Sequence, residues 1–401
     1  MPPLSGPRAV QVSRTLKHLV ALGWESSVVC FGPRSQRYNQ DPELAARLRA
    51  PSGVTLVRVP SLEERLFFRA LWRVVPPIKL LPDEKWVWIR AASRAAMRVA
   101  AERRPAVLVS FAQPWSDHLI GLQVQRATGL PWLAHFSDPW TDSPYLQGSG
   151  WQRRLWARME RDVISHAAAV VFVNAQTAER VMRKYPGEWR AKAHVIPHGF
   201  DCRDAAPGPA PVDPASLHIV HTGRFYEGLR TPEPLLRALA TLASRRPIAG
   251  TLRMTFVGTM IPAHQRLAAE LGLRDVVEFI ERVSFGESAR RAAMADVLLV
   301  IDAPAADSLF LPSKLIDYLP YGKPILGLTP ARGASADLLR SLGYPIVEPD
   351  DEAAIASAIE SLVDRKREGR LAASPSHEAV ARQYDIRATT RAFADLLAQC
   401  A

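Results

Sequence analysis

Cysteine is scarce in this chain: 401 residues contain three, Cys30, Cys202 and Cys400. An odd number at such wide spacing predicts neither a disulfide framework nor a cysteine-ligated metal site, which argues against a small disulfide-stabilised secreted domain. A reducing cytoplasm is therefore the expected location.

Long hydrophobic runs are also absent. No run reaches the roughly 20 apolar residues that a transmembrane helix needs, and the first eight residues, MPPLSGPR, lack the apolar segment of a secretory signal. An apolar content of 48% and a charged content of 23% are typical of soluble globular proteins. At 401 residues, two domains are expected.

Acidic residues are few in the first half only. Residues 1–200 hold 28 Lys and Arg against 15 Asp and Glu, whereas residues 201–401 hold 23 against 25. A basic half suits nucleic acid, an anionic membrane or an anionic substrate, but no RNA-binding signature or zinc-finger spacing is present. Residues 62–80 mix aromatic and basic residues in helical phase, which predicts either a helix on a bilayer interface or an ordinary surface helix.

Short apolar strands alternate with helices along the whole chain. This alternation predicts parallel sheets covered by helices on both faces, in two doubly wound α/β domains with a proline-rich linker at 201–214. The chain begins directly in the loop before a first helix, 7–22, although such a loop normally follows a first strand. We therefore expect the first strand to be missing and the true start to lie upstream of Met1. The predicted strands cover 27–31, 54–59, 106–110, 132–136, 169–173, 194–196, 217–221, 252–257, 276–280, 297–301 and 325–328.

The stretch 309–328 predicts a loop, a short helix, a tight turn and a buried strand. Pro312 suits a first helical position, and Gly322 suits the residue after a helix end. The free N–H groups at such a helix start attract anions, Lys314 adds a mobile positive charge, and Asp317 adds an acceptor for sugar hydroxyls one turn later. The alternative is an ordinary amphipathic helix with a surface Lys–Asp pair.

Two more candidate groups follow strands of the second half. Gly223 allows close approach of a ligand to the backbone, and the guanidinium groups of Arg224 and Arg230 match phosphate oxygens. Gly258 follows the next strand and predicts a second loop of close approach. The alternative for each arginine is a surface ion pair.

In the first half, strand 132–136 leads into Asp138 and Trp140. A carboxylate beside aromatic rings suits sugar binding, with the acid on hydroxyls and a ring face on C–H groups. The alternative for Asp138 is a turn residue before Pro139. Because ligands bind at the carboxyl ends of parallel strands, all these residues predict one cleft between two domains.

Taken in order, several motifs resemble glycosyltransferase family 4, closest to bacterial members that build exopolysaccharide, capsule or lipopolysaccharide. The resemblance covers nearly the whole chain. It implies the GT-B fold, with two Rossmann-like domains facing a cleft (residues 1–205 and 206–376) and a last helix, 377–401, packing back on the first domain. It also implies a retaining mechanism and a nucleotide-sugar donor bound without a required metal or other cofactor. The motifs are Pro3-Leu4-Ser5-Gly6, Phe136-Ser137-Asp138-Pro139-Trp140, Val195-Ile196-Pro197-His198-Gly199-Phe200-Asp201, Thr222-Gly223-Arg224, Pro312-Ser313-Lys314, Asp317-Tyr318 and Gly322-Lys323-Pro324.

The resemblance gives each candidate residue a role. Arg224 and Arg230 match the two basic residues on the donor diphosphate, which Ser313 and Lys314 also face. Asp317 matches the acid that holds the ribose. Gly6 belongs to the loop near donor phosphate and acceptor. Asp138 stands near the transferred sugar, with His135 and Trp140 as further candidates.

The expected activity is transfer of a hexose from a UDP- or GDP-sugar to a lipid-linked or growing glycan acceptor. An anionic inner-membrane surface is a candidate partner of the basic first half. Leu309 departs from the family, because it occupies the position of the first acid of the family's paired glutamates. Two rivals follow: a nucleotide-sugar epimerase of the same architecture, and a catalytically silent nucleotide-sugar-binding or scaffold protein.

Overall fold

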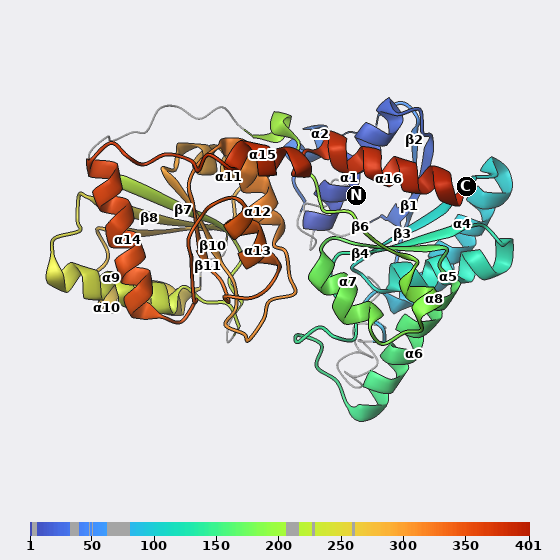
Figure 1. Ribbon diagram of the computed structural model, residues 1–401. Helices are drawn as coiled ribbons and strands as arrows, with labels where there is room; N and C mark the ends of the chain where they lie inside the picture. The colour runs from blue at the N-terminus through green and yellow to red at the C-terminus, as the bar shows by residue number, and fades with distance from the viewer. Residues whose placement is uncertain are drawn as a thin grey trace. The chain divides into compact units, whose positions relative to one another are not determined.

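The computed structural model describes residues 1, 6–32, 40–47, 49, 51–61, 81–205, 216–226, 229–258 and 261–401. The stretch 62–80, the first three residues of the Pro3–Gly6 motif and most of the proline-rich linker lie outside these residues. The chain divides into two compact units (Figure 1). Unit 1 comprises residues 1–199 and 386–401, and unit 2 comprises residues 200–385.

Unit 1 contains two parallel sheets. In one, β1 (Ser26–Phe31) pairs with β2 (Val54–Val59). The other has the order β3-β4-β5-β6, with β3 (Leu108–Ala112), β4 (Trp132–Phe136), β5 (Ala169–Phe172) and β6 (Ala193–Val195). Within the described residues, no strand pairs with both β1 and β3. The helices are α1 (Pro7–Ala21), α2 (Pro42–Arg47), η3 (Trp86–Trp88), α4 (Ile89–Arg103), α5 (Ser116–Thr128), α6 (Gly150–His166), α7 (Ala175–Met182), α8 (Gly187–Arg190) and α16 (Ile386–Cys400).

Strand β4 is buried on both faces, as a central strand of a parallel sheet must be. Alternate residues point to opposite faces. Trp132 and Phe136 join a core that includes Trp156 of α6, whereas Leu133 joins one that includes Phe393 of α16. The sheet therefore has helices on both faces.

Unit 2 is built on one six-stranded parallel sheet of order β12-β11-β10-β7-β8-β9. Its strands are β7 (Leu217–Gly223), β8 (Leu252–Gly258), β9 (Val277–Ile280), β10 (Val297–Ile301), β11 (Ile325–Leu328) and β12 (Ile346–Val347). Its helices are η4 (Cys202–Asp204), α9 (Glu233–Arg245), α10 (Pro262–Glu270), α11 (Phe285–Met294), α12 (Ser313–Tyr318), η5 (Leu319–Tyr321), α13 (Ala334–Ser341), α14 (Glu352–Arg367), α15 (His377–Ala381) and η6 (Arg382–Tyr384).

The central strand β10 is fully buried and divides the core of unit 2. Leu299 faces a cluster that includes Leu239 of α9 and Ile359 of α14, whereas Leu298 faces one that includes Leu315 of α12 and Leu339 of α13. The predicted doubly wound α/β architecture is confirmed.

The predicted last helix is wrong in its continuity. It breaks at residues 382–385, where Asp385 has an extended backbone (ψ 134°) and forms a bridge with Phe200. The apolar spacing continues across the break, but Ala381 packs in the core of unit 2 and Phe393 in that of unit 1. The two halves of the predicted helix therefore belong to different units.

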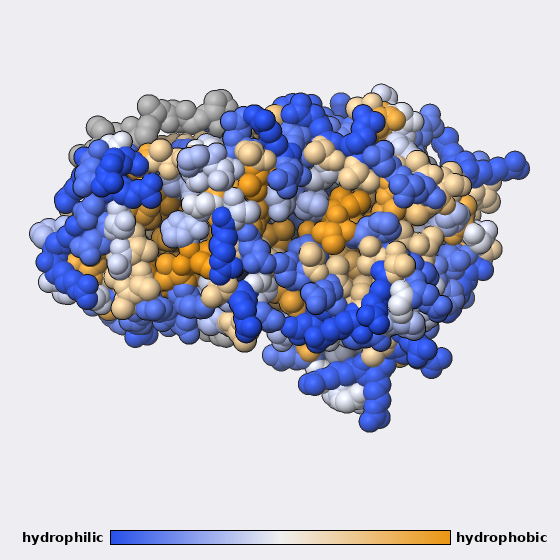
Figure 2. Space-filling view, in the orientation of Figure 1, coloured by the Kyte–Doolittle hydropathy of each residue, from blue (hydrophilic) through white to orange (hydrophobic). Residues whose placement is uncertain are grey.

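Hydrophilic side chains cover most of the face drawn in Figure 2, and hydrophobic ones show between them in each unit. No helix in the described part of the chain is both long and apolar enough to cross a membrane.

Candidate functional site

Two glycines end neighbouring strands of unit 2 side by side. Gly223 of β7 pairs in register with Gly258 of β8, and both have a φ of +130°, which side chains disfavour. A Cβ on Gly223 would lie 2.6 Å from Nζ of Lys314, and one on Gly258 would lie 2.8 Å from the carbonyl oxygen of Gly223. The ammonium group of Lys314 can therefore lie against the strand end only because Gly223 has no side chain.

Lys314 is held in place by a histidine that sequence reasoning missed. The Nζ atom of Lys314 lies 3.0 Å from Nε2 of His221, and Nδ1 of His221 lies 3.0 Å from the carbonyl oxygen of Leu299. Because a carbonyl only accepts, Nδ1 carries the proton and Nε2 accepts from Lys314. The prediction of a mobile charge is thus corrected, since Lys314 is fixed at the end of β7.

The surroundings of Lys314 in unit 2 carry more positive than negative charge. Burial lowers the pKa of Lys314 well below its ordinary value, Arg230 lowers it further, and Asp302 opposes both. Burial also lowers the pKa of His221, helped by Lys314 and Arg230, so the imidazole is neutral at neutral pH. An anion placed here would stabilise the protonated form of Lys314.

The two predicted arginines differ in their surroundings. Arg230 donates from Nη2 to the carbonyl oxygen of Arg224, at 2.7 Å, and its guanidinium lies 4.9 Å from the centre of the Tyr226 ring. The Nε atom of Arg230 is buried and has no hydrogen-bond partner within the described residues. The side chain of Arg224 is exposed. Arg230 lowers the pKa of both Lys314 and His221.

The short helix α12 carries the remaining candidates of unit 2. Ser313 and Asp317 are half-buried, and Asp317 lies one turn after Lys314. Tyr318, which follows, accepts a hydrogen bond from the backbone N–H of Thr222 at 2.8 Å, and burial raises the pKa of this tyrosine to about 12. This contact ties α12 to the end of β7. Leu309 is 8% exposed and leaves no acid at its position.

Asp302 is a second residue that the sequence did not indicate. It follows β10 and accepts a hydrogen bond from Oγ1 of Thr329 at 2.9 Å. Burial raises its pKa, while Arg230 and Lys314 act to lower it. The carboxylate therefore belongs to the same charged group as Lys314.

In unit 1, a half-buried arginine lies at the carboxyl ends of β3 and β4. Arg8, in the first turn of α1, donates from Nη2 to the carbonyl oxygen of Ala112 and to Oγ of Ser137. The same hydroxyl lies 3.1 Å from Nε2 of His198. Arg8 follows Gly6 by two residues, and this position beside a predicted ligand loop was the one sequence signal for it.

Asp138 is the acid beside Arg8. Its Oδ2 atom accepts from Nε2 of Gln113 at 3.4 Å. Burial raises its pKa and Arg8 lowers it, while burial lowers the pKa of Arg8 itself to about 10. Gly6 caps the start of α1 with an ordinary φ of −71°, and a Cβ there would meet no atom within 4 Å. The structure thus places Asp138 beside Arg8, and the role of Gly6 near a donor phosphate stays a prediction.

His135 and Trp140 lie among core side chains. Trp140 is fully buried and stacks on Trp115, with ring centres 5.0 Å apart, so neither ring face is open to a sugar. His135 packs between Phe111 and His198 on the other face of β4. Burial, followed by Arg8, lowers its pKa to about 3, so the ring is neutral.

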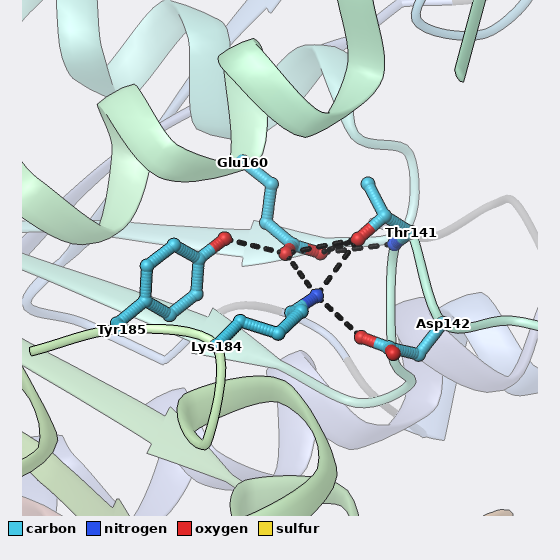
Figure 3. Close-up of polar contacts among 5 residues, drawn as sticks. All are labelled: Thr141, Asp142, Glu160, Lys184 and Tyr185. Carbon is cyan, nitrogen blue, oxygen red and sulfur yellow. Dashed lines mark hydrogen bonds and ion pairs between the residues drawn. The ribbon is translucent and has the colours of Figure 1, made fainter. Parts of the chain in front are cut away.

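A third polar cluster was not predicted at all (Figure 3). The carboxylate of Glu160, fully buried in α6, accepts from the N–H and hydroxyl of Thr141, from the hydroxyl of Tyr185 at 2.6 Å and from Nζ of Lys184 at 2.5 Å. Lys184 also pairs with Asp142. The cluster joins α6 to the loop that continues from Asp138. In the described part of the chain, no group of three or more His, Cys, Asp or Glu side chains could hold a metal ion.

Residues 8–199 match the family model of a glycosyl transferase 4-like domain. This part of the chain is similar to glycosyltransferase domains. The match spans most of unit 1 and includes Arg8 and Asp138. The predicted enzyme class, glycosyltransferase, is confirmed at the level of this domain. A comparison with curated proteins gives no match.

Solved structures extend the likeness to the full chain. Sucrose-phosphate synthase from Thermosynechococcus elongatus has a TM-score of 0.70 at 17% identity, over 98% of this chain and 94% of that one. Anabaena HepE in complex with UDP has a TM-score of 0.67 at 14% identity, over 99% and 98%. The lipopolysaccharide outer core galactosyltransferase WaaB has a TM-score of 0.62 at 13% identity, over 99% and 97%. At these identities the likeness concerns the fold, and the predicted GT-B fold is confirmed.

Proposed function

We propose that the protein is a retaining glycosyltransferase that moves a hexose from a UDP- or GDP-sugar to a lipid-linked or growing glycan acceptor in cell-surface polysaccharide synthesis. The observation that carries the proposal is the fixed ammonium of Lys314 against Gly223 at the end of β7. Two similar folds agree with it: HepE is described in complex with UDP, and WaaB is described as a lipopolysaccharide galactosyltransferase.

The proposed chemistry needs positive charge on a departing diphosphate. The bond between the anomeric carbon and the diphosphate breaks, and the electron pair leaves with the diphosphate. An acceptor hydroxyl forms the new bond on the same face and gives its proton to the departing phosphate oxygen. Lys314, Arg230 and Arg224 would stabilise the developing charge in place of a metal ion.

The other candidates have supporting roles in this proposal. Asp317 would hold the ribose hydroxyls, and Ser313 would face the phosphates beside Lys314. In unit 1, Asp138 would lie near the transferred sugar, with Arg8 opposing the rise that burial gives to the pKa of its carboxyl group.

The direct test measures nucleotide release from UDP- and GDP-hexoses by purified protein. Wild type should turn over one donor class, and Lys314→Met should lower kcat/KM by about a hundredfold, as loss of one preorganised donor does. Lys323→Met is the matched control, because Lys323 is a half-buried lysine whose Nζ donates to the carbonyl oxygen of Ala293 at 2.5 Å. Turnover by Lys314→Met equal to that of Lys323→Met would overturn the proposal.

The same assay separates the two rivals. An epimerase would release free nucleotide and an epimerised sugar without any acceptor. A silent binding protein is favoured by the buried, apolar Leu309, and it would bind donors without turnover.

We further propose that the protein acts in the cytoplasm, against the anionic inner face of the membrane. The support is the excess of basic residues in the first 200 positions. Sedimentation with liposomes should recover the protein with anionic vesicles and not with neutral ones. Equal recovery in the supernatant would contradict the proposal.

A further inference from the structure

A cavity of about 520 Å³ lies in unit 1, between the loop after β4 and the first turns of α6. This volume is within the range of small-molecule sites. Polar groups of Thr141, Ser143, Gln147 and Arg153 line it, and Leu146 and Trp156 give it an apolar wall. None of the candidate residues above lines it, so the cavity is a separate feature of the unit.

One end of the loop that forms this cavity is fixed to α6 by Glu160. The N–H of Thr141 donates to Oε2 of Glu160 at 2.9 Å, and its hydroxyl lies 3.0 Å from both carboxylate oxygens. Lys184 lies between Glu160 and Asp142 and bonds to both carboxylates (Figure 3). A charged group that is fully buried thus holds the start of the loop.

The other end of the loop is fixed to the same helix. Ser149 and Gln152 form a capping box in which the N–H of Ser149 donates to Oε1 of Gln152 at 2.9 Å. A Cβ on Gly148 would lie 2.4 Å from the ring of Trp156, so the loop packs directly on the indole. Because both ends are fixed to α6, the cavity is formed before a ligand arrives, which lowers the entropic cost of binding.

Arg153 supplies an oriented positive charge at this cavity. Its Nε atom donates to the carbonyl oxygen of Gly148 at 2.9 Å, which sets the direction of the guanidinium group. Within the described residues, its two terminal amino groups have no recorded protein partner. The two terminal amino groups of a guanidinium match the geometry of two oxygens of a carboxylate or phosphate.

The remaining lining suits a sugar. The side chains of Ser143 and Gln147 can bond ring hydroxyls, and the half-buried side chain of Leu146 offers an apolar contact to C–H groups. The start of α6, at its lower end in Figure 1, lies among hydrophilic atoms in Figure 2. The cavity therefore combines a charged fork, hydroxyl-bonding groups and an apolar wall.

We propose that this cavity binds a sugar unit of the acceptor glycan that carries an anionic group, a carboxylate or a phosphate. This inference rests on the proposed function. Thr141 follows the candidate acid Asp138 by three residues, which span at most about 10 Å. The bound unit would then be a neighbour of the sugar that receives the new bond.

The test measures, by saturation-transfer NMR, how glucuronate, glucose 6-phosphate and glucose bind to the full-length protein. Arg153→Gln removes the charge and keeps a polar side chain. Arg154→Gln is the matched control, with the same charge change on the next, exposed position of α6. At least one anionic sugar should bind wild type and Arg154→Gln more tightly than glucose does. The Kd of that sugar for Arg153→Gln should be about tenfold higher than its Kd for wild type. If glucuronate binds more tightly, the anionic group of the sugar is a carboxylate, and if glucose 6-phosphate does, it is a phosphate.

A second variant tests the cavity itself. Ala157 is exposed on α6 and lines the cavity, so Ala157→Trp fills the space and keeps Arg153. It should abolish binding of the anionic sugar without lowering the melting temperature. Binding retained in Ala157→Trp, equal losses in Arg153→Gln and Arg154→Gln, or no binding of either anion to wild type would each overturn the proposal.

Nucleotide release without acceptor keeps the two proposals distinguishable. Neither Arg153→Gln nor Ala157→Trp should change donor hydrolysis, since this reaction needs no acceptor and no donor-site candidate lines the cavity. If wild type binds the anionic sugar but hydrolyses no donor, the proposed function fails and the binding site stands.

Discussion

Lys314 and His221 share a hydrogen bond of 3.0 Å in which the lysine donates and the neutral imidazole accepts. The ring of His221 is fully buried, stacks on Phe225 with centres 5.0 Å apart, and donates from its other nitrogen to Leu299. The histidine therefore sets the position of the ammonium group without competing with it as a cation.

Replacing His221 by Phe should weaken nucleotide binding. Phenylalanine keeps the ring and its stacking but removes the acceptor for Lys314. A hydrogen bond to a charged group contributes about 1.5–3 kcal/mol, so we expect the Kd for UDP or GDP to rise about tenfold or more in calorimetry. The control is His218→Phe on the same strand, because His218 contacts Thr255 instead of Lys314. Equal affinities in the two variants would contradict this role.

The protein should also take up protons when it binds a nucleotide. The pKa of Lys314 is lowered in the folded protein, so at pH values between that lowered pKa and 10.5 part of the population is neutral. A diphosphate beside the amine favours the charged form and raises the pKa, and protons are therefore taken up. Calorimetry at pH 8.5 in buffers of different ionisation enthalpy measures this uptake. Lys314→Met should abolish it, and uptake that persists in this variant would assign it to another group.

The sheets of this protein were largely predictable from the sequence. The predicted bounds of β2, β4, β10 and β11 agree with the structure to the residue, because each is a short, mostly apolar run. The break at Asp385 was not predictable, since it depends on which of two cores receives each half of the helix.

The candidate site was predictable only in part. Gly223, Gly258 and Lys314 follow or flank predicted strand ends, and the structure brings them together. His221 and Asp302 were missed because their roles depend on strand order: β10 lies beside β7, although 73 residues lie between Gly223, the last residue of β7, and Val297, the first of β10. Local sequence patterns do not reveal such a pairing.

Trp140 is a predicted site residue that the structure places in the core. Its position beside Asp138 predicted a sugar contact, but its ring stacks on Trp115 in the core. Sequence spacing cannot tell an aromatic ring that lines a site from one that packs beneath it.

The Glu160 cluster leads to a prediction about stability. Glu160 is fully buried and accepts hydrogen bonds from Thr141, Lys184 and Tyr185, so its replacement by Ala leaves these donors without their shared acceptor. Breaking a buried ion pair from one side costs about 3–5 kcal/mol, and Glu160→Ala should lower the free energy of unfolding of unit 1 by this amount.

Lys184→Met is the matched variant. The side chain of Lys184 is 31% exposed, and without it Glu160 keeps its bonds to Thr141 and Tyr185, so the loss should be about 1 kcal/mol. Thermal unfolding followed by tryptophan fluorescence compares the two, because Trp140 and Trp156 are core residues of the same unit. If the two variants unfold at the same temperature, the carboxylate does not hold the loop. In that case the cavity beside α6 would lack the fixed wall on which a preformed sugar site depends.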